Sequence, residues 1–304
     1  MSENFLWSFI PGELKLPHLS YHYFIHGKKH PFEPLATQFS MANAAWLTDL
    51  AFLAYADKRF ITEQLNEAGL TGAPCFIGFD QDIESTQCII AHNNEIIVVF
   101  FRGTEFNPKR ILNAVLDTSI DIQAALVEVP ELDGCVHYGF YKEAEKISAT
   151  LIKTLDKIRT TQSVWFAGHS MGGALTILTA KLYSARTQRN VSGVYTIGCP
   201  RVGNETFAAH YQLPLYCLIN HKDPITRIPV EGKIMEQSSN SGNYVPMGKT
   251  IFFDQTGGIT DTDNRPPITR SFLRIGITLE LSLIIDMLDH APLRYSQKIW
   301  RHLS

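Results

Sequence analysis

The stretch VWFAGHSMGGALTILTA, residues 164–180, indicates how this chain folds. Its first four residues are apolar and suit a buried strand, and the residues from Gly172 onward suit a helix. Between them, the pattern G-x-S-x-G places Ser170 on a sharp turn from strand to helix. Glycines at 168 and 172 allow the strand and the helix to approach closely while Ser170 projects outward. The pattern predicts a nucleophilic serine, with the N–H of Met171 at the start of the helix as a donor to an oxyanion.

Apolar strands and amphipathic helices alternate on both sides of this stretch. The alternation predicts an α/β fold with a mostly parallel central sheet flanked by helices. The expected strands are residues 76–80, 87–92, 95–101, 164–167, 191–198, 215–220 and 250–253, and the expected helices are residues 40–56, 136–158 and 172–186. We expect one domain over residues 39–304, preceded by an extended N-terminal arm at residues 1–38 and interrupted by an irregular excursion at residues 231–269.

Charge and cysteine content argue against several classes of protein. The chain has 27 Lys and Arg against 30 Asp and Glu, a net charge of -3, which disfavours nucleic acid as a partner. Its five cysteines form no C-x-x-C pair, so neither a disulfide framework nor a zinc site is expected. Four histidines recur at every fourth position, but proline and glycine disfavour the helix that would align them: His18, His22, His26 and His30. We therefore expect no metal and no cofactor.

A serine nucleophile needs a base and a carboxylate that orients the base. In sheets with a strand-to-helix nucleophile turn, the acid and then the histidine follow the serine along the chain. Asp223 is the best-placed acid, because it lies just past the strand at 215–220, at the edge where parallel sheets carry their sites. The competing acids lie in the irregular excursion or around a C-terminal helix: Asp254, Asp261, Asp263, Asp286 and Asp289.

Two histidines beyond Asp223 remain as candidates for the base. His302 lies two residues from the end of the sequence, where order is usually poor. His290 follows an apolar segment and precedes Ala291-Pro292, which suits a loop. We expect His290 to act as the base, and the predicted triad is Ser170, Asp223 and His290.

Four blocks of the sequence resemble the class 3 lipase family, the filamentous-fungal type of α/β-hydrolase. They are IIVVFFRGTE (96–105), VHYGF (136–140) with FAGHSMGGAL (166–175), YTIGCPRVGN (195–204) with INHKDPITRIP (219–229), and DHAPLRY (289–295). FRGT, and CPRVGN followed by N-x-x-D-P-I-x-R-I-P, make the resemblance specific. It implies an α/β-hydrolase whose triad maps onto Ser170, Asp223 and His290, with an oxyanion hole from Thr104 and the amide of Met171. The family often has His where Pro246 stands here.

The residues around Thr104 agree with that role. Arg102-Gly103-Thr104 ends the most apolar strand of the chain, and Thr104 offers both an N–H and a hydroxyl. We expect Gly103 to permit an unusual turn there.

A short amphipathic helix is expected directly after Thr104. Asn107-Pro108 is a typical helix start, and four apolar residues then share one face: Ile111, Leu112, Val115 and Leu116. The resemblance implies a mobile lid over the acyl groove at this position, within about residues 105–133. An ordinary helix packed on the core is the alternative.

The sequence favours a carboxylic ester hydrolase that acts on lipid esters, with triacylglycerols as the preferred class. A phospholipase A1, a short-chain carboxylesterase and a non-catalytic lipid-binding protein are the alternatives. We expect a peripheral contact with a lipid–water interface and no transmembrane segment, because the uncharged residues 160–180 have glycines at their centre. No signal peptide is recognisable, which favours a cytoplasmic location and leaves secretion by a signal-less route open.

Overall fold

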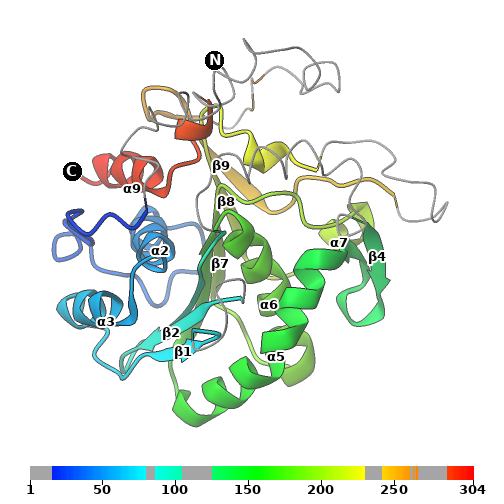
Figure 1. The fold of residues 1–304 in the computed structure, drawn as a ribbon, viewed down its shortest axis with the longest axis horizontal. Coiled ribbons are helices and arrows are strands. Elements are labelled where there is room, and N and C mark those ends of the chain that lie inside the picture. Colours follow the sequence, from blue (N-terminus) through cyan, green and yellow to red (C-terminus); the bar gives the residue numbers. More distant parts are fainter. Residues whose placement is uncertain are drawn as a thin grey trace, which may run out of the picture.

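The computed structural model describes residues 16–79, 86–104, 125–229, 242–260, 263, 265 and 286–304 of the chain. An eight-stranded sheet runs through its centre in the order β1-β2-β3-β6-β7-β8-β9-β10 (Figure 1). Its strands are β1 (Cys75–Ile77), β2 (Cys88–His92), β3 (Ile96–Phe101), β6 (Ser163–His169), β7 (Gly193–Ile197), β8 (Leu215–Asn220), β9 (Lys249–Phe253) and β10 (Ile259–Thr260).

The five inner strands, β3, β6, β7, β8 and β9, run parallel to one another, and the outer strands β1, β2 and β10 pair antiparallel with their neighbours. This arrangement confirms the predicted α/β fold with a mostly parallel central sheet. Because the inner strands are parallel, their carboxyl ends meet at one edge of the sheet, where the predicted site residues follow them in the sequence.

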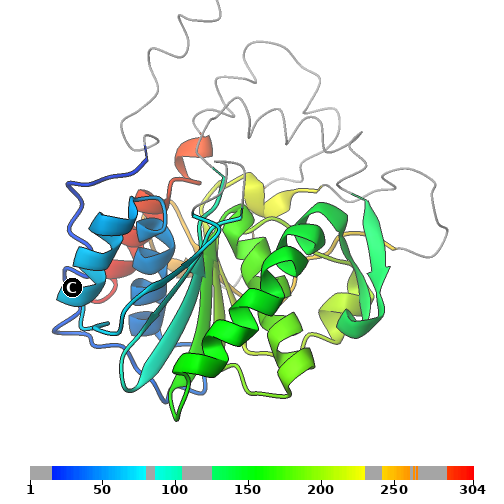
Figure 2. The same cartoon turned by 60° about the horizontal axis from the view of Figure 1, so that its bottom comes forward.

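Helices cover both faces of the sheet. On one face lie α5 (Tyr138–Ile158) and α6 (Met171–Thr187), and on the other lie α2 (Met41–Leu53), α3 (Lys58–Glu67) and α9 (Pro292–Arg301), as Figure 2 shows. Residues along β3 alternate between the two cores: Ile97, Val99 and Phe101 face the α5–α6 side, and Val98 and Phe100 face the α2 side. Strand β3 is therefore buried on both faces, as its continuous apolar run predicted.

The helix predicted at 136–158 starts later than expected. Residues Gly134–His137 form β5, which pairs with β4 (Leu126–Val129) in a separate two-stranded sheet. His137 then caps the helix, since its Nδ1 accepts from the N–H of Phe140. The short helices α3 and α7 (Glu205–Ala209) were not predicted. None of the described helices combines the length and the hydropathy that a membrane span needs.

A buried carboxylate joins the N-terminal segment to the C-terminal helix. Asp49 of α2 accepts from the N–H of Phe24 at 2.6 Å, from the hydroxyl of Tyr21 at 3.1 Å and from Nε1 of Trp300 in α9 at 2.9 Å. Residues 16–38, part of the expected arm, form successive turns that pack on α2 through aromatic side chains such as Tyr23. Burial raises the pKa of Asp49 from 3.8 to about 6, against the opposing effect of these hydrogen bonds.

We expect Asp49→Asn to change how the free energy of unfolding depends on pH. Because the pKa of Asp49 is raised in the fold, the neutral carboxyl stabilises the protein below about pH 4, and that contribution is lost as the pH rises to about 6. A shift of about two pKa units corresponds to about 3 kcal/mol. Asparagine cannot ionise, so the stability of the variant relative to wild type should rise between pH 4 and 7 and then level off. Urea denaturation across this range measures the difference, and a constant difference would contradict the assignment.

Candidate active site

Ser170 occupies the turn between β6 and α6 in a strained backbone conformation. Its φ of 57° and ψ of −129° are unusual for a residue with a side chain. A Cβ on Gly168 would lie 2.2 Å from the carbonyl oxygen of Gly172, and a Cβ on Gly172 would lie 2.6 Å from that of Phe101. The two glycines therefore allow β3, β6 and α6 to approach closely, as the sequence predicted, and the turn presents Ser170 at the carboxyl edge of the sheet.

Asp223 lies three residues past the end of β8 and is completely buried. Its Oδ1 accepts from the N–H of Ile225 at 2.9 Å, and its own N–H donates to the carbonyl of Asn220 at 2.8 Å. These local bonds close a tight turn that aims the other oxygen, Oδ2, at the base.

His290 connects Asp223 to Ser170. Its Nδ1 lies 2.9 Å from Oδ2 of Asp223, and its Nε2 lies 2.9 Å from Oγ of Ser170. Because a carboxylate only accepts, Nδ1 carries the proton and Nε2 is left free to accept from the serine hydroxyl. The structure thus brings the three predicted triad residues together in the geometry of a nucleophile, a base and an orienting acid.

Gly198, just past the end of β7, makes room for the acid and the base. A Cβ at this position would lie 2.7 Å from Oδ2 of Asp223 and 2.9 Å from Nδ1 of His290. Its φ of 58° also favours glycine. The block YTIGCPRVGN contains this glycine, but its role was not predicted from the sequence.

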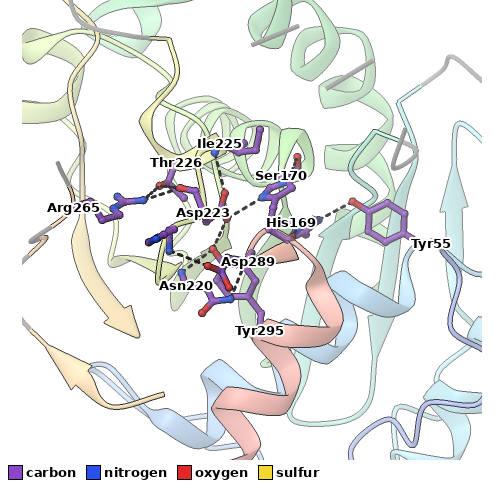
Figure 3. A network of polar contacts seen from close by, with 12 residues as sticks. Tyr55, His169, Ser170, Asn220, Asp223, Ile225, Thr226, Arg265, Asp289 and Tyr295 are labelled. Carbon is purple, nitrogen blue, oxygen red and sulfur yellow. Dashed lines mark hydrogen bonds and ion pairs between the residues drawn. The ribbon is translucent and has the colours of Figure 1, made fainter. Parts of the chain in front are cut away.

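Tyr295 of α9 supports the acid from the far side of the sheet edge (Figure 3). Its hydroxyl donates to Oδ2 of Asp223 at 2.6 Å and accepts from the N–H of Asn220 at 2.9 Å. Burial, together with the nearby Asp223, raises the pKa of Tyr295, so the hydroxyl stays protonated as a donor. Arg265 donates to the backbone carbonyl of Asp223 at 2.7 Å and to the hydroxyl of Thr226 at 2.9 Å. Neither Tyr295 nor Arg265 was predicted from the sequence as a supporting residue.

A second histidine next to the nucleophile forms a buried hydrogen-bonded chain (Figure 3). Nε2 of His169 donates to the carbonyl of His290 at 2.8 Å, so Nδ1 is unprotonated and accepts from the hydroxyl of Tyr55, also at 2.8 Å. The hydroxyl of Tyr55 in turn accepts from the N–H of Gly103. Burial, and then the neighbouring ring of His290, hold the pKa of His169 well below its usual range. A neutral His169 thus links the backbone of the base to the strand end that carries Thr104.

The two predicted oxyanion donors lie side by side. The hydroxyl of Thr104 donates to Sδ of Met171 at 3.5 Å, and the N–H of Met171 is the first of α6. Gly103 was expected to permit an unusual turn, and it does not have a positive φ. Gly103 is required by space, because a Cβ there would lie 2.2 Å from the hydroxyl of Tyr55 and 2.7 Å from the carbonyl oxygen of His169.

Asp254, Asp263 and His302 make side-chain contacts other than with Ser170, His290 and the carboxylate of Asp223. Asp254 caps a turn through the N–H of Gly258, and Asp263 pairs with Arg265. Nε2 of His302 contacts the carbonyl of Gly257. Asp261 and the lid residues fall outside the described part of the chain: Ile111, Leu112, Val115 and Leu116. Within the described residues, no group of three or more His, Cys, Asp or Glu side chains could hold a metal ion.

Comparison with known proteins relates the same segments to lipases. Residues 98–233 match the family model described as Lipase (class 3). The toxin TseL of Vibrio cholerae serotype O1 is 33% identical over 111 residues, 36% of this chain and 17% of that protein. A lipase of Rhizopus niveus is 29% identical over 143 residues, 44% of this chain and 34% of that protein. The chain thus spans about a third or less of the length of these relatives.

Solved structures of fungal lipases share the fold. The triacylglyceride lipase of Rhizomucor miehei matches with a TM-score of 0.53 at 22% identity, covering 71% of this chain and 81% of that one. The propeptide complex of a Rhizomucor miehei lipase matches with a TM-score of 0.56 at 21% identity, covering 82% of this chain and 77% of that one. This likeness shows that the chain has the α/β-hydrolase fold of these enzymes.

We expect Gly198→Ala to slow the reaction of Ser170 with a fluorophosphonate by at least about 100-fold, because the added methyl group displaces the acid or the base. Gly69→Ala is the matched control. Gly69 also has a positive φ, 81°, but nothing lies within 4 Å of the position of its Cβ. Both variants therefore carry backbone strain, and only Gly198→Ala crowds the pair. Equal labelling rates in the two variants would show that the space at Gly198 does not matter.

Proposed function

We propose that this chain, whose residues 98–233 match the class 3 lipase family, hydrolyses carboxylic esters of lipids through an acyl-enzyme on Ser170. The observation that carries the proposal is the continuous hydrogen-bonded chain from Ser170 through His290 to Asp223, with 2.9 Å at both links. A serine hydroxyl is a weak nucleophile without a base, and this arrangement supplies both the base and the group that orients it.

Each residue of the site has a chemical role in this proposal. Nε2 of His290 takes the hydroxyl proton as Oγ of Ser170 attacks the ester carbonyl carbon. Asp223 holds the Nδ1–H tautomer and stabilises the positive charge that forms on the ring. The N–H of Met171 and the hydroxyl of Thr104 stabilise the oxyanion. To do so, the Thr104 hydroxyl turns away from Sδ of Met171. His290 then gives its proton to the departing alcohol. In the second step His290 takes a proton from the water that attacks the acyl-enzyme and returns it to Oγ of Ser170 as the carboxylic acid leaves.

Lipid esters are the proposed substrate class, and triacylglycerols are the preferred member of it. The names of several relatives support this choice: one is a lipase, and another, 31% identical over 103 residues, is a secreted mono- and diacylglycerol lipase of Fusarium solani. A phospholipase A1 and a short-chain carboxylesterase use the same chemistry at the serine, so substrate profiles distinguish them.

We also propose, from the sequence, that the helix expected after Thr104 is a lid and that the protein contacts the lipid surface peripherally. The apolar face of the expected helix would cover the acyl groove in water. At a lipid surface it would turn outward and bury against acyl chains, which gains about 25 cal/mol for each Å² of apolar area removed from water. The interface shifts the equilibrium because the open state contacts lipid better than the closed state does.

We expect Ser170→Ala to lower kcat on an emulsified triacylglycerol by at least about 10⁴-fold, because the nucleophile is lost. Adding Asp223→Ala should cost little more, since residues of a triad act as a unit. His302→Ala serves as a control and should remain close to wild type. Release of fatty acid at constant pH measures the rate. A Ser170→Ala protein that keeps half of the wild-type rate would rule out the proposed nucleophile.

Activity on a short soluble ester should rise several-fold when detergent micelles are added, if the lid opens at an interface. Replacing Leu112 and Leu116 by Ser should weaken this rise and increase the rate on monomeric ester, because the closed lid loses apolar packing. Rates over p-nitrophenyl esters of increasing chain length, with and without micelles, test both points. An enzyme indifferent to micelles whose rate falls steadily beyond short acyl chains would be a short-chain carboxylesterase instead.

A further inference from the structure

The loops that carry the acid and the base are joined by a second histidine–carboxylate pair. One loop supplies His221 and Asp223, and the other supplies Asp289 and His290. Nδ1 of His221 lies 2.9 Å from Oδ2 of Asp289, the same distance that separates His290 from Asp223. Each loop therefore gives one histidine and one carboxylate to the other, and the two pairs run in opposite directions.

Asp289 is held by three consecutive residues of the acid loop. Besides His221, the N–H of Lys222 donates to Oδ2 of Asp289 at 3.2 Å. Nδ2 of Asn220 donates to the backbone carbonyl of Asp289 at 2.8 Å, and this amide is completely buried. These three bonds fix the residue directly before His290 against the residues directly before Asp223.

His221 is itself fixed from a third direction. Its N–H donates to the carbonyl of Phe253, the last residue of β9, at 2.6 Å. Its φ of 39° is rare for a residue with a side chain, and such strain persists only where the surrounding contacts impose it. The pair lies at the rim of the site, with the side chains of His221 and Asp289 exposed by 23% and 11%. Arg294 lies 3.5 Å from the other oxygen of Asp289.

We propose that His221 and Asp289 are positioning residues that hold the acid and base loops in register, so that His290 stays within reach of both Ser170 and Asp223. This inference rests on the proposed ester hydrolysis at Ser170. The Nδ1–H tautomer of a neutral histidine already donates to a carboxylate, so the pair holds the loops in either protonation state of His221. Neither residue touches the reacting atoms, and their contribution lies in alignment, where small displacements are costly.

The test compares three replacements of His221. Alanine removes the donor to Asp289, whereas asparagine places its amide nitrogen near the position of Nδ1 and keeps the donor. Glutamine, whose amide lies one bond further along the side chain, does not. We expect His221→Ala and His221→Gln to lower kcat by about 10- to 100-fold with KM changed less than about twofold, and His221→Asn to recover most of the loss. Alanine and asparagine variants with the same kcat would overturn the proposal.

A double-mutant cycle with Asp289→Ala separates the pair from general damage to the loops. The double variant His221→Ala/Asp289→Ala should be no slower than Asp289→Ala, because Asp289→Ala already removes the contact with His221. Additive losses would mean that the two residues act independently. His302→Ala, a histidine change outside both loops, should leave kcat unchanged.

A proton NMR signature makes the result independent of ester cleavage. The downfield Nδ1–H signal of His290, identified by its absence in His290→Ala, should broaden in His221→Ala and stay sharp in His221→Asn. An unchanged signal in His221→Ala would overturn the positioning role even if the enzyme cleaves esters. If the variants show this pattern of signals but the wild-type protein cleaves no ester, the proposed function is contradicted and the positioning role is supported.

Discussion

The candidate site depends on the complete burial of one carboxylate. Asp223 has no exposed surface, and a buried charge is tolerated only when hydrogen bonds replace the water that it loses. Its donors come from three parts of the chain: the N–H of Ile225 in its own turn, Nδ1 of His290 in the loop before α9, and the hydroxyl of Tyr295 in α9. The carboxylate therefore has all its partners only when the sheet edge and the C-terminal helix are in place together.

The helices on the α2 face of the sheet support the site as much as those on the α6 face do. Tyr55, just past α2, reaches His169 and the backbone of Gly103, and Tyr295 reaches Asp223 from α9. Helices α2 and α9 are themselves joined by Asp49 and Trp300. The packing of α2 and α9 therefore both stabilises this face of the sheet and aligns the site residues. Ser170 itself lies at the start of α6, on the opposite face.

The sequence was sufficient where a local pattern determines the structure. Apolar runs predicted the inner strands, and the G-x-S-x-G pattern predicted the turn that carries Ser170. The order of residues along the chain then helped to select Asp223 and His290. It was not sufficient where a contact joins distant segments. Asp289 was set aside as one of the acids around a C-terminal helix, yet its side chain meets His221, 68 residues earlier. Gly103 was assigned to a turn because the approach of Tyr55 from another layer leaves no mark in the neighbouring residues.

The crossed pairs between residues 221–223 and 289–290 also bear on protein engineering. Each loop carries half of two contacts, so a loop grafted alone from a relative brings a histidine without its carboxylate, or the reverse. A chimera that exchanges both loops keeps the set complete. In this protein the segments 221–223 and 289–290 should therefore be exchanged together. A crossover point between them in the sequence would separate two loops that are in contact at the sheet edge.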